Sequence, residues 1–216
     1  MNILSIPPPT MTTPDLEQLK AECVCQKSAS AWFCTKADPR WAFSNMAGGM
    51  PLFFPMPRAP QNEWCASEQL YQATRYGATI QCLPAANLQA GPCVRNRIRQ
   101  SKNPRAAKMT QKCAVAAGLV RPDWEHPEQE VRIQTMLWVL ELKFYWNPYT
   151  FGGTLRETGD LPIVEISTKD AFGGRKAEGD ELRGCNVLGK LLMNVRARSA
   201  TVRRGQFTHP KGWHLP

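Results

Sequence analysis

The sequence predicts an α+β fold that is mainly helical, with a few short strands, in a single compact domain. A chain of 216 residues with 43% hydrophobic content is long enough to bury one substantial core. Helical periodicity predicts the longer helices, and a short run of branched apolar residues predicts a strand. We expect an N-terminal arm and short helix at 1–28, the main domain at 29–199 and a basic C-terminal tail at 200–216.

The first expected elements are short. Thr13 precedes a proline and can cap a helix through Cys25, because proline in the first turn loses no needed hydrogen bond. Residues 41–60 are rich in proline, glycine, methionine and phenylalanine, which predicts irregular, packed loop with short strand. Ser67 is expected to open a short helix that ends near Gly77, and a polar connection follows.

Longer helices are expected in the second half of the chain. Asn103 before a proline is a typical helix start, and Gly118 is a typical stop. The longest helix should follow Asp123 or start at Pro127 and end near Trp146. Its apolar stripe recurs at helical spacing: Ile133, Leu137, Leu140 and Phe144.

The last elements are a strand, a helix and a tail. The apolar run at 162–168 predicts a buried strand. Asn186 is expected to cap a final helix whose apolar face includes Leu188 and Leu192. The chain from Ala197 carries basic residues without an acid, which predicts an irregular basic arm.

The net charge of +9 comes from one segment. Between Gln69 and Pro122 there are nine basic residues and no acidic one, whereas the charges of the remaining chain cancel. Such a segment is either a solvated basic face or a phosphate-binding surface. The candidates for a nucleic-acid patch are Arg95, Arg97, Arg99 and Lys102.

The eight cysteines do not suggest a metal or a disulfide framework. They form no Cys-x-x-Cys pair, and the three histidines do not lie at zinc-finger spacing from them. We therefore expect reduced thiols, no bound metal and no cofactor. No run of about 18 apolar residues and no secretory signal is found, so we expect a cytoplasmic protein with no membrane partner.

Four residues stand out, although each also has a purely structural explanation. A carboxylate in the first turn of a helix, as at Glu68, and a cation in the last turn, as at Lys143, are both favoured by the helix dipole. Asp170 follows a strand and could cap a turn. Trp124 could belong to the core.

Five segments, in this order, resemble the NADAR (YbiA-like) family. The similarity runs from about Trp41 to Ser199. It is carried by Phe43-Ser44-Asn45, by WCASEQLYQA from Trp64, by MLWVLELKF from Met136, by IVEISTKDAFG from Ile163 and by GCNVLGKLLMNVR from Gly184.

The resemblance implies a mainly helical α+β domain of the NADAR type and an N-glycosidase acting on ribose-linked substrates. It implies that Glu68, Lys143 and Asp170 are catalytic. The substrate-binding candidates are Ser44, Asn45, Trp64, Tyr71, Arg75, Trp124, Phe172, Gly173, Asn186 and Gly189.

The chemistry of the reaction fits these residue types. Cleavage of a ribose–nitrogen bond builds positive charge on the sugar and negative charge on the departing base, so a carboxylate and a proton donor both help. A lysine on an apolar helix loses its proton readily, so Lys143 could form an imine with the open-chain ribose. Trp124 offers a flat face to a base.

Three functions remain open on this reading. The first is removal of ADP-ribose from modified guanine in nucleic acid, preferably DNA, in some family members as the antitoxin to an ADP-ribosyltransferase. The second is hydrolysis of riboflavin-biosynthesis intermediates, and the third is non-catalytic binding of ADP-ribose. The basic segment favours the first, because a polyanion is then the expected partner.

Overall fold

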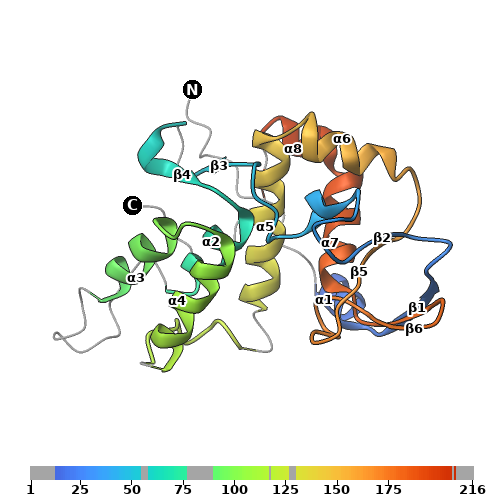
Figure 1. The fold of residues 1–216 in the computed structure, drawn as a ribbon, viewed down its shortest axis with the longest axis horizontal. Coiled ribbons are helices and arrows are strands. Elements are labelled where there is room, and N and C mark those ends of the chain that lie inside the picture. The colour runs from blue at the N-terminus through green and yellow to red at the C-terminus, as the bar shows by residue number, and fades with distance from the viewer. Residues whose placement is uncertain are drawn as a thin grey trace.

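Helix α5, Val131–Trp146, runs through the centre of the molecule (Figure 1). Most of its residues are buried, because four helices and a strand pack against it: α2 (Ser67–Thr74), α6 (Thr150–Glu157), α7 (Val187–Ala197), α8 (Ser199–Arg203) and β3 (Leu52–Phe53). A helix that is apolar on nearly every side is stable only when it is covered in this way. The central helix therefore organises the core, and the predicted α+β fold is confirmed.

The computed structural model describes residues 13–54, 58–76, 90–116, 118–126, 130–205 and 207. In this part of the chain no helix is both long and apolar enough to cross a bilayer. The other helices are α1 (Thr13–Lys20), α2 (Ser67–Thr74), α3 (Ala90–Arg99), α4 (Pro104–Ala116), α6 (Thr150–Glu157), α7 (Val187–Ala197) and α8 (Ser199–Arg203), with short 3-10 turns at Trp41–Phe43 and Pro60–Asn62.

The strands are short and form three small sheets. One is antiparallel in the order β1-β7-β6, one pairs β2 with β5 in parallel, and one pairs β3 with β4. Their bounds are β1 Cys23–Gln26, β2 Ala31–Phe33, β3 Leu52–Phe53, β4 Glu63–Trp64, β5 Ile163–Glu165, β6 Lys176–Glu178 and β7 Glu181–Gly184.

Strand β5 is held between β2 and helix α7. The β2–β5 register places Ala31 opposite Ile163 and Phe33 opposite Glu165. Helix α7 approaches β5 so closely that a Cβ on Gly189 would lie 2.1 Å from the carbonyl oxygen of Ile163. Only glycine fits there, so Gly189 is required by the packing of α7 on β5.

The N-terminal expectation is wrong in one respect. The helix ends at Lys20 instead of continuing through Cys25, and residues 23–26 form strand β1, which pairs with β7. The end of α1 is fixed by Lys190, whose Nζ donates to the carbonyl oxygens of Gln18, Leu19 and Ala21. The expected cap at Thr13 involves a side chain outside the described residues.

The helices of the middle region follow the prediction with two differences. Asn103 caps α4 through a 2.9 Å hydrogen bond to the amide of Ala106, and Gly118 adopts φ +68° after the helix, as expected. The sequence pattern did not predict α3. Helix α5 begins at Val131, later than expected, after Glu130 in a left-handed conformation that pairs its carboxylate with Lys20. Residues 127–129 lie outside the described part.

The C-terminal expectation is also wrong in part. Residues 199–203 form helix α8 rather than irregular tail, and Val202 is fully buried. Arg198 donates to the buried carboxylate of Glu141 on α5 at 2.5 Å, which ties this end of the chain to the central helix. Burial of an apolar residue and a charge pair, not propensity, therefore orders the segment.

Candidate active site

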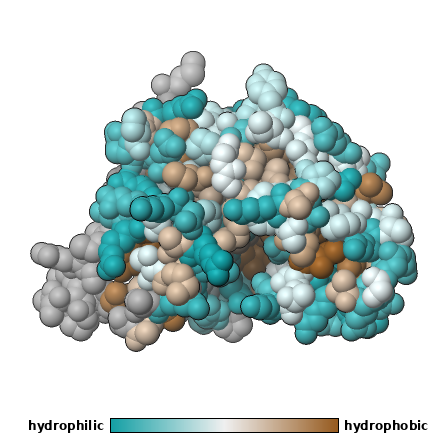
Figure 2. Space-filling model, viewed as in Figure 1, coloured by the Kyte–Doolittle hydropathy of each residue, from teal (hydrophilic) through white to brown (hydrophobic). Residues whose placement is uncertain are grey.

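A pocket with a cavity volume of about 400 Å³ opens between α2, α5 and the segment that joins β5 to α7. Figure 2 shows a hollow near the centre of this face, with hydrophilic residues on both sides of it. Nine of the sequence-predicted site residues line it: Ser44, Asn45, Glu68, Tyr71, Arg75, Trp124, Asp170, Phe172 and Gly173.

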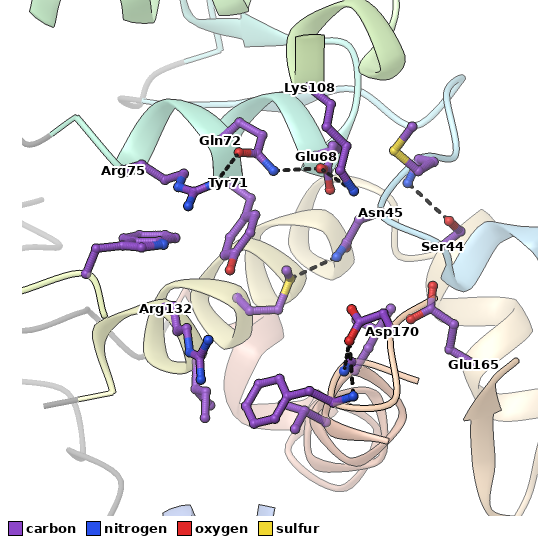
Figure 3. A pocket seen from close by; sticks show the side chains of 18 of the residues that line it. Ser44, Asn45, Glu68, Tyr71, Gln72, Arg75, Lys108, Arg132, Glu165 and Asp170 are labelled. Atoms are coloured by element: carbon purple, nitrogen blue, oxygen red, sulfur yellow. Dashed lines mark hydrogen bonds and ion pairs between the residues drawn. The ribbon is translucent and has the colours of Figure 1, made fainter. Parts of the chain in front are cut away.

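Helix α2 supplies one wall from a single helical face. Glu68, Tyr71, Gln72 and Arg75 are spaced three or four residues apart, so their side chains project to the same side. Gln72 donates to the Glu68 carboxylate at 2.7 Å and accepts from Arg75 at 3.2 Å. This chain of hydrogen bonds fixes the Glu68 carboxylate, which is 6% exposed, in the pocket (Figure 3).

A second carboxyl group, Glu165, faces the same pocket from the end of β5. Burial, together with the nearby charges of Asp170 and Glu68, raises the pKa of Glu165 to about 7, whereas Lys108 opposes the shift. A carboxyl group with this pKa can hold a proton at neutral pH and donate it. Glu165 is therefore the best-placed acid among the described residues of the pocket.

Asp170 is positioned by a tight turn. Its Oδ1 accepts hydrogen bonds from the amides of Phe172 and Gly173 at 3.0 and 2.8 Å. A Cβ on Gly173 would lie 2.6 Å from Asp170 Oδ2, so glycine lets the carboxylate lie against the backbone. This geometry is compatible with both interpretations of Asp170, as a residue that caps a turn and as a catalytic residue.

Two arginine–aromatic pairs flank the opposite end of the pocket. The Arg75 guanidinium lies 5.5 Å from the ring centroid of Trp124, and that of Arg132 lies 4.5 Å from the ring centroid of Phe172. Tyr71 contacts Trp124 with ring centroids 5.3 Å apart, and burial raises the pKa of its phenol. In Figure 3 the two arginines lie on the side away from Glu165.

The segment after the first 3-10 turn forms the pocket edge at Ser44 and Asn45. Asn45 is 7% exposed; its Nδ2 donates to the Met136 sulfur, and its backbone oxygen accepts from the Glu68 amide at 3.0 Å. The other side-chain atom, Oδ1, is buried with no hydrogen-bond partner among the described residues. Such an unpaired acceptor is costly and points to a donor on a ligand.

Lys143 does not line this pocket. It is fully buried behind the same segment, where its Nζ donates to the carbonyl oxygens of Ala42 at 2.6 Å and Ser44 at 3.0 Å. The ammonium also lies 4.7 Å from the ring centroid of Phe151. Burial lowers the pKa of Lys143 to about 7, the direction that the sequence suggested. Its geometry is that of a group that holds the Ser44 backbone.

Three other candidate residues also lie outside the pocket lining. Trp64 is buried and donates from Nε1 to the Phe54 carbonyl oxygen at 2.9 Å. Asn186 is the N-cap residue of α7, as expected, but its side chain makes no cap hydrogen bond; its Oδ1 accepts from the Glu165 amide at 3.2 Å and its Nδ2 donates to the Ile163 carbonyl at 2.8 Å. Asn186 thereby fixes β5, the strand that carries Glu165. Gly189, which has no side chain, leaves room for the close approach of α7 to the Ile163 carbonyl oxygen.

The basic segment reaches the pocket through Arg75 and Lys108. Lys108 on α4 lines the pocket, and its Nζ lies 3.9 Å from the Glu68 carboxylate. The proposed patch residues lie on or beside α3, where Arg97 and Lys102 are exposed while Arg95 and Arg99 are half-buried. This surface therefore continues from the pocket along α4 toward α3, which packs against it.

Several lining residues were not predicted from the sequence, although the sequence patterns around Glu165 and Gln72 could have indicated them. Glu165 is an acid inside an otherwise apolar strand, a placement that rarely occurs without a role. Gln72 follows Glu68 by one helical turn, the spacing at which the two side chains meet. Arg132, Met136 and Lys108 gave no comparable signal, because only the packing of α4 and α5 brings them to the pocket.

The fold and the site define a single-domain α+β protein whose central pocket is acidic at one end and rich in arginine and aromatic side chains at the other. The model of the NADAR domain matches residues 26–199, and the chain belongs to the NADAR family.

Relatives are found by sequence and by structure. The chain is 34% identical over 113 residues to the riboflavin biosynthesis protein PYRR, chloroplastic, of Arabidopsis thaliana and 31% identical over 136 residues to that of Zea mays. These matches cover 51% and 62% of this chain but only 17% and 19% of the relatives. The NMR structure of the E. coli protein YbiA shares the fold, with a TM-score of 0.55 and 24% identity over 84% of this chain and 92% of that one.

Proposed function

We propose that the protein is an N-glycosidase that separates a ribosyl group from a nucleobase. One observation carries the proposal: the carboxyl groups of Glu68, Glu165 and Asp170 converge on a pocket that also has aromatic walls. Cleavage of a ribose–nitrogen bond requires stabilisation of a cationic sugar and protonation of the departing base. Aromatic faces suit the base, so the pocket offers each group that the reaction needs.

The proposed roles follow from the environment of each acid. Glu165, with a pKa raised to about 7 by burial, donates its proton to the departing base nitrogen. The Glu68 carboxylate, fixed by Gln72, stabilises the positive charge that develops on the sugar. Asp170 accepts the proton of the water that attacks the anomeric carbon.

Binding of the substrate is assigned to the remaining lining residues. The unpaired Oδ1 of Asn45 accepts a hydrogen bond from a ribose hydroxyl. Tyr71 and Trp124 provide an aromatic wall, at the end away from Glu165, against which the adenine of an ADP-ribosyl group can lie, an interaction worth ~1–3 kcal/mol per base. A binding-only protein would not need a protonated acid next to two further carboxyl groups, so we favour catalysis over ADP-ribose binding alone.

Lys143 is proposed as a positioning residue rather than as the nucleophile. Its Nζ is buried behind Ser44, and it stabilises the edge that carries Asn45. An imine with the open-chain ribose would need an amine inside the pocket, and Lys108 is the lysine that lines it. We therefore propose direct attack by water, with Lys108 as the site at which any covalent adduct would form.

The preferred substrate is ADP-ribosylated guanine in DNA. The exposed cations of α3 and α4 lead to the pocket through Lys108, and a basic surface beside a site favours a polyanion. A role as the antitoxin to a DNA ADP-ribosyltransferase would follow from such an activity. Neither statement depends on a cofactor or on a metal.

Hydrolysis of a riboflavin-biosynthesis intermediate is the second candidate. It is favoured by the relatives in Arabidopsis thaliana and Zea mays, which are named riboflavin biosynthesis proteins. Such an intermediate is also a ribose-linked phosphate, so the same pocket chemistry serves both substrates. The two candidates differ in whether the α3–α4 surface contributes to binding.

The decisive experiment offers both substrates to the same protein. Guanine-ADP-ribosylated DNA and a phosphorylated riboflavin precursor are incubated separately, and the released sugar is measured by mass spectrometry. We expect release of ADP-ribose from DNA at a higher kcat/KM than release from the precursor, and no release by Glu68→Gln. Turnover of the precursor alone would make it the substrate, and binding of ADP-ribose without turnover of either would establish a binding protein.

A further inference from the structure

The carboxylate of Glu125 lies between two arginines at the mouth of the pocket. Its Oε1 is 3.7 Å from Arg75 and its Oε2 is 3.2 Å from Arg132. The Glu125 side chain is nevertheless 62% exposed, so burial does not hold it there. Two cations thus converge on one solvent-exposed anion that the chain itself provides.

Each of these arginines is supported by its own neighbours. Arg75 lies over Trp124 and donates to Gln72 at 3.2 Å, and Arg132 lies over Phe172. The two side chains come from different elements, since Arg75 ends α2 and Arg132 is in the first turn of α5. A guanidinium held against an aromatic ring keeps a fixed orientation, which favours paired hydrogen bonds to an oxyanion.

The charges inside the pocket restrict where a phosphate can bind. Glu68, Glu165 and Asp170 gather at the other end, and the carboxylates of Glu68 and Asp170 would repel a second anion there (Figure 3). Lys108 offers one flexible cation that already faces Glu68. Among the described residues that line the pocket, two positive charges combine with access from solvent at the end between Arg75 and Arg132.

We propose that Arg75 and Arg132 bind a phosphate or diphosphate group of the substrate, and that Glu125 occupies this site in the free protein. A terminal phosphate, or a diphosphate taken as a whole, carries more negative charge than a carboxylate and has more acceptor oxygens, so it replaces Glu125 when the substrate arrives. The inference rests on the proposed function, because it names the part of that ribose-linked substrate held at the pocket mouth. Glu125 then acts as an internal competitor, which disfavours the binding of ligands that lack a phosphate group.

Binding of pyrophosphate, measured by calorimetry without any turnover, tests the site directly. If Glu125 fills the site about four fifths of the time, Glu125→Gln should bind pyrophosphate about fivefold more tightly than the parent. Glu157→Gln is the matched control: it removes the same charge from an exposed position at the end of α6. An equal gain in both variants, or no gain in Glu125→Gln, overturns the proposal.

A second variant tests the arginine directly. Arg132→Lys keeps the positive charge but loses the planar fork, so pyrophosphate affinity should fall roughly tenfold, as for the loss of one charge-assisted hydrogen bond. Unchanged affinity in a variant with a parental melting temperature would also overturn the site. Because pyrophosphate binding is independent of turnover, the phosphate site can hold when no N-glycosidase activity is found, and the activity can hold when the phosphate site fails.

Discussion

The two sides of the pocket are built in different ways. On the side of α5, α7 and β5 the polar groups are buried and tied to backbone atoms, as Lys143 is to Ser44 and Asn186 is to Glu165. On the side of α3 and α4 the cations are largely exposed, and Lys108 is 57% exposed. Burial shifts the pKa of Glu165 and of Lys143, whereas exposed cations act mainly through long-range attraction.

This difference teaches where each kind of effect should arise. Fixed positions and shifted pKa values suit the chemical step, so changes on the buried side should lower kcat and the free energy of unfolding. Screened charges suit capture of the substrate, so changes on the exposed side should raise KM and alter its salt dependence.

Glu165→Gln should give the largest loss. Removal of the proposed general acid should lower kcat by ~10²–10⁴-fold, with little change in substrate affinity. In the parent, the acid must be protonated, so kcat should fall as the pH rises through about 7, the raised pKa of Glu165. The variant should lack this decline, which a pH profile of kcat measures.

The matched control for this variant is Glu178→Gln, an exposed change on β6. It should leave both kcat and its pH profile as in the parent. A Glu165→Gln protein that is folded and retains the decline above pH 7 would show that another group supplies the proton.

Lys143→Met should lower stability first and activity second. The carbonyl oxygens of Ala42 and Ser44 would lose their buried donor. Each buried oxygen left without a hydrogen bond lowers the free energy of unfolding by ~1–3 kcal/mol. For a chain of this length each 1 kcal/mol corresponds to roughly 2–4 °C in melting temperature. We expect a kcat loss of about tenfold, the equivalent of 1.4 kcal/mol, because Asn45 is no longer held in place.

Lys108→Met is the exposed counterpart, and its melting temperature should match that of the parent. Borohydride added during turnover separates positioning from covalent chemistry, since it traps an imine as a stable adduct. We expect no adduct on Lys143. A sugar-modified peptide containing Lys143 would restore the nucleophile that the sequence suggested, and one containing Lys108 would move the imine to that residue.

The sequence predicted the fold and half of the site for a clear physical reason. Helix starts such as Asn103 and a helical face such as that of α2 are encoded locally, so Glu68, Tyr71 and Arg75 could be placed together. The position of Lys143 depends on where a distant segment packs, because its partners lie about a hundred residues earlier. The formation of helix α8 also depends on distant residues, because α8 packs against α5.

The exposed side should respond to salt. Replacement of Arg97, Arg99 and Lys102 by glutamine should raise KM on modified DNA by up to about tenfold and reduce its salt dependence by at most ~2.7 in log–log slope. KM on a free modified nucleotide should not change, because the nucleotide does not reach α3. Equal effects on both substrates, or on kcat, would mean that the patch is a solvated face or supports the fold.

Treatment with a chelator should have the smallest effect of all: none. Within the described residues no three histidine, cysteine or acidic side chains are arranged to hold a metal ion. A cation between Glu165 and Asp170 would also favour the ionised form of both and remove the raised pKa on which the proton donor depends. We therefore expect parental kcat in EDTA. Loss of activity that zinc or magnesium restores would mean that the buried side works through a metal. The two sides of the pocket would then not differ as proposed, because the buried side would not depend on the raised pKa of Glu165.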